Sequence, residues 1–510
     1  MKNLLGFIAL LSSFFVSAQD FEIKTLKANY RFSFETLKRS TEKDIGLLGI
    51  GYDLFPFEKR DDVYFTFNSY SAISGDRAGV FSFGLGAGWR KAFLKDRFAI
   101  DLGAFVAGGG GGGAPDGGGL ILRAHSNLFF NFDRFSIFTG VSRFDFIDGD
   151  MRSTNFNLGF TADNKFYSAR RISNAKDGDF NQGVRNEKRI RVSGVATGYT
   201  KIHDGPVSSG HKTYDSTQTI GLFGAEIDKF ITKNLYASVE LNGLVRSGID
   251  GYMSYLVGLG YQLPFLKDKM SLDAQVMGGP SGGGGMLTGG GGTLKAALAL
   301  RANIYRDFEL FASYGRMWAP VGNFDVDVLD FGISKNIKYY QTDGKIGTKN
   351  INLKSKNNLD EFGFEVFNRS YFPPNIKDKN GIFYDRFFNL IGFQISKNIS
   401  KNFIALASTV WAYQGSYGAY GEGWVGLEYN WINTNKWRFN TRAKLGAAGG
   451  GGISLGSGLV AQYGIGSKYE LTDNWELSLN AGRMQGIQGN FTPIYVDFGV
   501  KFTVFQLGLN

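Results

Sequence analysis

Few side chains in this 510-residue chain have the types that catalysis or metal binding needs. There is no cysteine, which excludes a thiol nucleophile, a cysteine zinc site, an iron–sulfur cluster and a disulfide scaffold. The three histidines are His125, His203 and His211, and only His203 stands next to a carboxylate, that of Asp204. This pair lies in a loop-like segment and has no partner serine motif. The sequence therefore predicts no enzyme, no metal site and no cofactor.

The glycine-rich segments do not form a nucleotide site either. They match the dinucleotide pattern G-x-G-x-x-G only because any run of glycines does, and the βαβ context of such a site is missing. The phosphate-binding pattern G-x-x-x-x-G-K-[ST] is absent, since Gly289–Gly292 is followed by Thr293, Leu294 and Lys295. The formal net charge of +10 is spread over the whole chain, so we expect no nucleic-acid partner.

The first 18 residues have the pattern of a secretory signal peptide. A basic start at Lys2 precedes an apolar stretch from Leu4 to Val16, and Val16-Ser17-Ala18 supplies a small-x-small cleavage pattern. This stretch is too short to span a bilayer, and no later stretch approaches 18 uninterrupted apolar residues. We therefore expect an exported protein, which can enter a membrane only as a closed barrel.

The chain contains three copies of one unit. Gly315-Arg316-Met317 recurs as Gly482-Arg483-Met484, and Phe93-Leu94-Lys95-Asp96 recurs as Phe265-Leu266-Lys267-Asp268. The predicted organisation is a signal peptide at 1–18, repeats at 19–163, 188–335 and 359–510, and polar linkers at 164–187 and 336–358.

Each copy has the period-two alternation of β-strands, as in the last strand, where Ile494, Val496 and Phe498 alternate with Tyr495 and Asp497. We count about eight strands per copy, with tight charged turns at one edge of the sheet (the tight-turn edge) and glycine-rich connections at the other (the glycine edge). The predicted fold is all-β: a large antiparallel transmembrane β-barrel built from three tandem homologous repeats of about eight strands each.

The signal peptide ending Val16-Ser17-Ala18, the Phe- and Tyr-rich alternating strands and the apolar closing strand at 495–505 make the chain resemble Gram-negative outer-membrane β-barrel proteins. The resemblance is to a generic class, and no specific family is matched. It implies localisation in the cell outer membrane, with outer-membrane lipid as a partner. The chain departs from the class at its end, Leu509-Asn510, because these barrels commonly end on an aromatic residue.

Two sets of polar residues occupy matching positions in the copies. Inward parity makes the first set candidate lumen-facing residues, which either bias a pore toward anions or simply line a polar lumen: Arg123, Lys295 and Gln462, with His125 and Arg301 nearby. The second set shares its parity with apolar residues and is predicted to lie at the membrane boundary: Arg143, Arg316 and Arg483.

The chain holds 72 glycines, and long runs of them recur in register in all three copies. They are represented by Gly108, Gly282 and Gly449, which we place on one rim of the barrel. Two interpretations stay open: the runs fold inward as a constriction or gate, or they are mobile hairpin tips under little constraint.

Two functions follow from this architecture. The leading hypothesis is a pore or channel for solutes, since a barrel of 16 or more strands leaves an aqueous lumen unless it is plugged. The alternative is an accessory or scaffold subunit of an envelope secretion or assembly complex, which docks its protein partners through the linkers at 164–187 and 336–358.

Overall fold

The computed structural model describes residues 24–39, 43–57, 60–168, 184–203, 219–246, 251–342, 359–378, 381–400, 402–434, 436–472 and 474–507. All regular secondary structure in these ranges is β-strand. None of the ranges contains a helix that is long and apolar enough to cross a membrane. The predicted signal peptide lies outside the described residues, as do 169–183 and 343–358 in the two predicted linkers.

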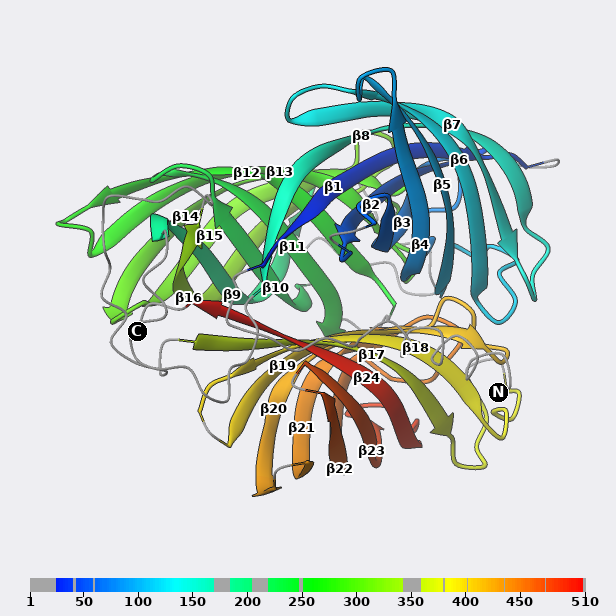
Figure 1. Cartoon of the computed structure of the whole chain (residues 1–510). Coiled ribbons are helices and arrows are strands. Elements are labelled where there is room, and N and C mark those ends of the chain that lie inside the picture. The colour runs from blue at the N-terminus through cyan, green and yellow to red at the C-terminus, as the bar shows by residue number, and fades with distance from the viewer. Residues whose placement is uncertain are drawn as a thin grey trace.

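The strands close into three barrels of eight antiparallel strands each (Figure 1). Barrel 1 consists of β1 (Lys24–Leu37), β2 (Ile45–Phe55), β3 (Val63–Ser74), β4 (Phe81–Phe93), β5 (Phe98–Gly110), β6 (Leu120–Asn131), β7 (Phe135–Phe146) and β8 (Arg152–Ser168). Barrel 2 consists of β9 (Val184–Ile202), β10 (Ile220–Phe230), β11 (Leu235–Arg246), β12 (Met253–Phe265), β13 (Met270–Gly282), β14 (Gly292–Tyr305), β15 (Phe308–Trp318) and β16 (Asp325–Thr342). Barrel 3 consists of β17 (Leu359–Phe372), β18 (Phe388–Asn398), β19 (Phe403–Gln414), β20 (Gly421–Asn433), β21 (Trp437–Gly449), β22 (Leu459–Thr472), β23 (Trp475–Gly486) and β24 (Ile494–Leu507).

The three repeats are confirmed by their matching strands. The third strands, β3, β11 and β19, have 12 residues each. The fifth strands, β5, β13 and β21, have 13 residues each. An all-β, antiparallel chain with three tandem repeats of eight strands is therefore what the structure contains.

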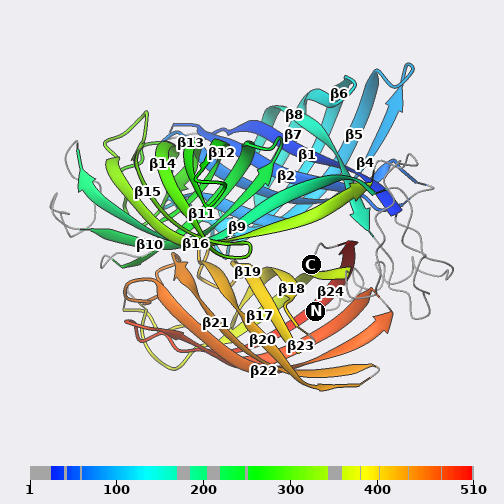
Figure 2. The ribbon, with the colours of Figure 1, turned by 90° about the vertical axis from the view of Figure 1, so that its left-hand side faces the viewer.

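The expectation of one large barrel is corrected in one respect, the closure of the wall. In each repeat the first strand pairs with the last: β1 with β8, β9 with β16, and β17 with β24. Eight strands suffice for closure because the lumen they enclose is narrow enough for side chains to fill. Figure 2 shows barrel 3 as a separate set of strands below barrels 1 and 2.

The strands run further than the predicted repeat boundaries. Strand β8 continues to Ser168 and β9 begins at Val184, so both ends of the linker predicted at 164–187 belong to barrel walls. Strand β16 likewise continues to Thr342, inside the segment predicted at 336–358. Ser168, Val184 and Thr342, the described ends of these strands, lie at the tight-turn edge of their barrels.

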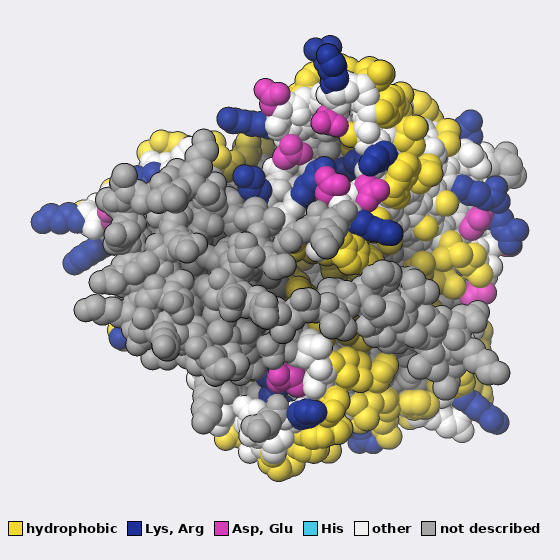
Figure 3. All heavy atoms as spheres, viewed as in Figure 1, with side chains coloured by type: hydrophobic (Ala, Val, Ile, Leu, Met, Phe, Trp, Pro, Cys, Tyr) yellow, Lys and Arg dark blue, Asp and Glu magenta, His cyan; other side chains and the backbone are white. Residues whose placement is uncertain are grey.

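Each wall is polar on the inside and apolar on the outside. On β1, Glu35 is fully buried in the lumen, whereas its neighbour Phe34 is 43% exposed on the outer wall. Hydrophobic side chains cover the outer walls of barrels 1 and 3 in the view of Figure 3. This arrangement inverts that of a water-soluble barrel and matches a wall that faces lipid.

At the glycine edge the lumen of each barrel is closed by a cluster of buried apolar side chains, here called the plug. In barrel 1 the plug includes Leu47, Phe105 and Phe146. The plugs of the other two barrels also contain several aromatic or sulfur-containing side chains: Tyr252, Met286 and Phe324 in barrel 2, and Tyr384, Phe388 and Phe491 in barrel 3.

Candidate functional site

The lumen of barrel 1 is filled by a network of ion pairs next to the plug. Arg31 donates from Nη2 to Asp53 Oδ2 at 2.8 Å and from Nη1 to Asp101 Oδ2 at 3.3 Å. Arg90 donates to the same two carboxylates at 2.7 and 3.2 Å. His125 contacts Asp101 at 2.9 Å, so this histidine is a member of the network. Two guanidinium groups and two carboxylates thereby occupy the space that a solute would need.

Barrels 2 and 3 are filled in the same way. In barrel 2, Arg191 bridges Asp228 at 2.7 Å and Asp273 at 2.8 Å. Arg301, on the adjacent strand β14, donates to Asp273 at 2.9 Å. In barrel 3, Arg369 binds Asp497 through two bonds of 2.8 and 2.9 Å, the fork-to-fork geometry of strong charge-assisted pairs. The described lumens therefore leave no wide aqueous path.

Three matching positions in each barrel are here called the lumen triplet. They explain why one of the predicted lumen-facing residues is neutral where its counterparts are cations. Cross-strand register pairs the members on the first and eighth strands of every barrel, and the third member lies on the sixth strand. Each triplet holds one cation, one carboxylate and one neutral polar side chain, distributed differently: Arg123, Glu35 and Asn157 in barrel 1; Lys295, Asp330 and Thr197 in barrel 2; Arg369, Asp497 and Gln462 in barrel 3. All nine side chains are buried.

The cation and carboxylate of each triplet are paired. Arg123 binds Glu35. Lys295 lies 3.0 Å from Asp330. Where Gln462 replaces a cation in barrel 3, Arg369 supplies the positive charge from the facing strand. The predicted lumen-facing cations thus act as counterions inside packed lumens, an arrangement that neutralises buried charge.

The remaining predicted polar residues lie outside the lumens. Arg143 and Arg316 are exposed on the outer wall and pair with Asp145 at 3.0 Å and with Asp325, respectively. Arg483 is also exposed, at the matching position of β23. His203 contacts Asp327 at 2.6 Å, whereas Asp204 and His211 lie outside the described residues.

The glycine runs are neither inward gates nor free tips, because each run packs against the next barrel. Strands β5 and β6 contact β19, strands β13 and β14 contact β3, and strands β21 and β22 contact β11. Barrel 1 therefore contacts barrel 3, barrel 3 contacts barrel 2, and barrel 2 contacts barrel 1 through equivalent surfaces. A head-to-tail contact that repeats in this way closes a ring, so the single chain has the organisation of a cyclic trimer.

The approach in these interfaces is too close for side chains. A Cβ at Gly282 would lie 2.3 Å from the backbone nitrogen of Gly79 in barrel 1. A Cβ at Gly108 would lie 2.7 Å from the carbonyl oxygen of Trp411 in barrel 3. Gly449 lies beside Gly251 of barrel 2 in the third interface. Glycine is required at such positions because backbone meets backbone.

Backbone hydrogen bonds cross the interface between barrels 1 and 3. Gly418 donates to the carbonyl of Gly117 at 3.1 Å, and Ala419 donates to that of Gly109 at 3.2 Å. Within the same glycine-rich connection, burial raises the pKa of the Asp116 carboxyl, which accepts a bond from the Gly111 N–H at 2.7 Å. The sequence signal for these partners is weak, since the segments that receive the runs hold only scattered glycines.

Ala419 provides a test of this interface. It has a φ of 70°, and the matching residues of the other barrels are Gly79 and Gly251, with φ of 89° and 83°. A left-handed alanine is strained by about 1 kcal/mol. We expect Ala419→Gly to raise the free energy of unfolding by up to about 1 kcal/mol in urea titrations. As a control, Ala412→Gly, at a fully buried strand position, is expected to lower it.

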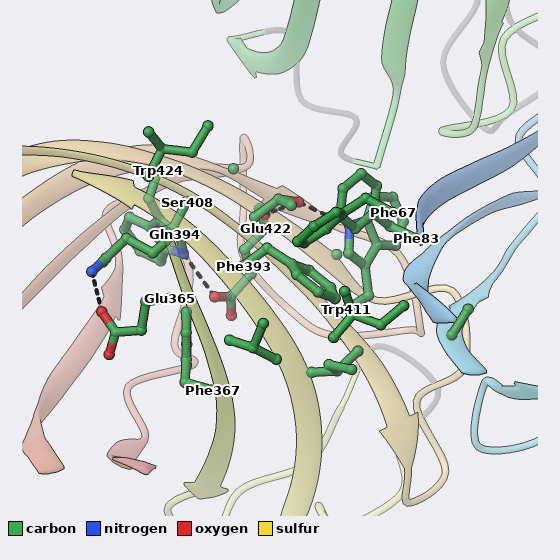
Figure 4. Close-up of a pocket in the computed structure, with 18 of the residues that line it drawn as sticks. Phe67, Phe83, Glu365, Phe367, Phe393, Gln394, Ser408, Trp411, Glu422 and Trp424 are labelled. Carbon is green, nitrogen blue, oxygen red and sulfur yellow. Dashed lines mark hydrogen bonds between the residues drawn. The ribbon is translucent and has the colours of Figure 1, made fainter. Parts of the chain in front are cut away.

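A cavity of about 2500 Å³, here called the central cavity, lies between the three barrels. Outer-wall side chains of all three barrels line it, including Leu85, Ile227 and Val425. Figure 4 shows Phe67 and Phe83 of barrel 1 beside Phe393 and Trp411 of barrel 3. The rings of Phe83 and Phe393 lie 4.8 Å apart, edge to face. Glu365, Gln394 and Glu422, also drawn there, line the cavity as buried side chains of barrel 3, where Gln394 donates to Glu365 at 2.6 Å.

The described part of the chain supplies little else that could react or bind a metal. Among the described residues, no three His, Asp or Glu side chains are arranged to hold a metal ion. Sequence reasoning missed the carboxylates Asp53, Asp101 and Asp273, which neutralise the lumen cations. Their signal was available, because each stands at an inward position of an alternating strand, and buried charges require partners.

The fold class is now defined. One polypeptide forms three closed eight-stranded antiparallel barrels, which have filled lumens and share a central cavity. The sequence matches no known protein family and no curated protein. The siderophore receptor PirA from Acinetobacter baumannii aligns at 10% identity over 95% of this chain and 81% of its own, with a TM-score of 0.29. OpdQ from Pseudomonas aeruginosa aligns at 11% identity over 95% and 98%, with a TM-score of 0.22. Scores this low do not define a shared fold.

Proposed function

We propose that this is an outer-membrane protein that binds amphiphilic molecules and passes them through the central cavity between its barrels. The observation that carries the proposal is the contrast between the filled, charged lumens and a largely apolar space of about 2500 Å³ that is lined mainly by outer-wall side chains of the three barrels. The inverted walls, apolar outside and charged inside, support placement in a membrane. A hydrophilic solute gains nothing from apolar walls, whereas an acyl chain is stabilised by them.

The alternative prediction, a scaffold role, depends on chain segments that lie outside the described residues. Protein partners were expected at the linkers 164–187 and 336–358, of which 169–183 and 343–358 lie outside the structure's described ranges. The central cavity belongs to described strands of all three barrels, and it therefore favours binding of a molecule over docking of a protein.

A substitution that narrows the cavity tests the proposal. A Cβ at Gly423 meets nothing within 4 Å, and Gly423 lines the central cavity, so Gly423→Trp narrows the cavity without disturbing a wall. In vesicles we expect the wild-type protein to exchange a fluorescent acyl-chain probe between leaflets, and Gly423→Trp to slow that exchange about tenfold. In planar bilayers the wild-type protein is expected to give no stepwise ion current.

The matched control is Gly194→Trp. Gly194 is also an outward strand glycine whose Cβ meets nothing within 4 Å, but it does not line the cavity. This variant is expected to exchange the probe at the wild-type rate. Stepwise currents that change with Arg123→Gln and not with Gly423→Trp would place the path in a lumen and contradict the proposal.

A further inference from the structure

The outer wall of barrel 3 carries a row of uncharged polar side chains that face the central cavity, here called the polar row. It consists of Asn368 and Ser370 on β17, Asn389 on β18, and Tyr413 and Gln414 on β19. All five line the cavity near the glycine edge. Polar groups on a wall that faces an apolar space cost free energy unless they have hydrogen-bond partners.

The polar row is joined by hydrogen bonds that run in one direction. Tyr413 donates to Asn368 Oδ1 at 2.6 Å, and Ser370 donates to Asn389 Oδ1 at 2.6 Å. Asn389 in turn donates to Gln414 Oε1 at 2.6 Å. Among the described residues no acceptor pairs with the Gln414 side-chain nitrogen, which is exposed at the end of the row. The row therefore presents both amide donors and hydroxyl groups to a ligand.

The other two barrels show that the fold does not require these residues. The position of Asn368 is occupied by Phe34 in barrel 1 and Ala196 in barrel 2. The position of Asn389 is glycine in both, at Gly46 and Gly221. The position of Tyr413 holds an aliphatic residue in both: Ile73 and Val245. The same wall thus closes without a polar row, which points to a role in binding.

The surroundings select the chemistry of the ligand. No Lys or Arg is among the described residues that line the cavity, so nothing there neutralises a phosphate. The aromatic rings of Phe372 and Phe387, 6.5 Å apart, lie next to the row, and Trp411 lies on the same wall. Amides and hydroxyls beside aromatic faces suit a neutral headgroup with several hydroxyls, while the cavity beyond takes acyl chains.

We propose that the polar row binds the uncharged polyhydroxyl headgroup of a glycolipid whose acyl chains occupy the central cavity. The inference rests on the proposed function and specifies its ligand. The headgroup supplies an acceptor for the Gln414 amide and hydrogen-bonds to the hydroxyl oxygens of the polar row, and the apolar walls hold the chains.

The test replaces the polar row with the residues of barrel 1. The variant Asn368→Phe/Asn389→Gly/Tyr413→Ile carries side chains that the same wall already accommodates in that barrel. Full-length protein is equilibrated with vesicles of phosphatidylglycerol and a monoglycosyl diacylglycerol with identical acyl chains, purified in mild detergent, and its bound lipid is measured by native mass spectrometry. The wild-type protein is expected to retain the glycolipid about tenfold over phosphatidylglycerol, and the variant to lose this preference while it still retains lipid.

The control is Tyr314→Ile, the same substitution at an exposed tyrosine of barrel 2 that does not line the cavity, and it is expected to keep the preference. The headgroup site is overturned if the wild-type protein binds lipid without headgroup preference, or if the preference survives the triple substitution. Either result leaves the proposed function standing. A wild-type protein that retains no lipid of either kind overturns both.

Discussion

Replacing Gly282 by leucine is expected to separate barrel 2 from barrel 1. The backbone nitrogen of Gly79 lies 2.3 Å from the Cβ that leucine adds, and the nearest atoms around it all belong to the backbone of barrel 1. Gly282 itself has no left-handed φ, so the substitution does not strain its own strand. Overpacking of this kind typically costs about 1–3 kcal/mol. Here the whole cost weakens one contact of the ring, that between barrels 1 and 2.

The separation can be measured because the chain has no cysteine. Cysteines are introduced at Lys95 and Lys267, which lie in exposed turns of barrels 1 and 2, and are spin-labelled. Double electron–electron resonance then measures the distance between the two barrels. We expect a narrow distribution in the parent and a broader, longer one with Gly282→Leu. Gly194→Leu, at an exposed glycine with no neighbour within 4 Å, is expected to leave it narrow. Equal distributions in all three proteins would mean that the interface does not depend on Gly282.

The alternation of side chains predicted the strands, their number and the facing of Arg123, Lys295 and Gln462, but it could not predict closure. Inward and outward residues alternate identically in one wall of 24 strands and in three walls of eight. The signal for closure was the length of the links at 164–187 and 336–358, because adjacent antiparallel strands need only a short hairpin. A long link at the tight-turn edge fits a chain that leaves one barrel and starts another.

The role of the glycine runs could not be predicted from the runs alone. A glycine indicates close approach of backbone, but the partner of Gly282 is Gly79, about two hundred residues away in another barrel. Gln462 posed the same problem inside a lumen. As a neutral residue among cations it breaks the repeat, and only the pairing of β17 with β24 shows that Arg369 compensates for it.

The lumen triplet predicts the largest loss of stability in the chain, on replacing Arg369 by threonine. Arg369 is fully buried and is held by Asp497 through two bonds and by Glu422 at 2.8 Å. Removing one partner of a buried ion pair costs about 3–5 kcal/mol, because a charge is left without compensation. Glu422 keeps its bonds from Tyr371, Tyr420 and Trp424, so the uncompensated charge is mainly that of Asp497.

Barrel 2 supplies the rescue. It carries Thr197, Lys295 and Asp330 where barrel 3 carries Arg369, Gln462 and Asp497, so the double variant Arg369→Thr/Gln462→Lys gives barrel 3 the charge arrangement of barrel 2. We expect it to regain more than half of the loss in urea unfolding followed by tryptophan fluorescence. This probe reports mainly barrel 3, which holds five of the seven tryptophans. The control Gln462→Lys alone adds an unpaired cation beside Arg369 and is expected to destabilise. If the double variant were no more stable than Arg369→Thr, the three positions would not act as one charge-balanced set, and the lumens would owe their stability to packing alone.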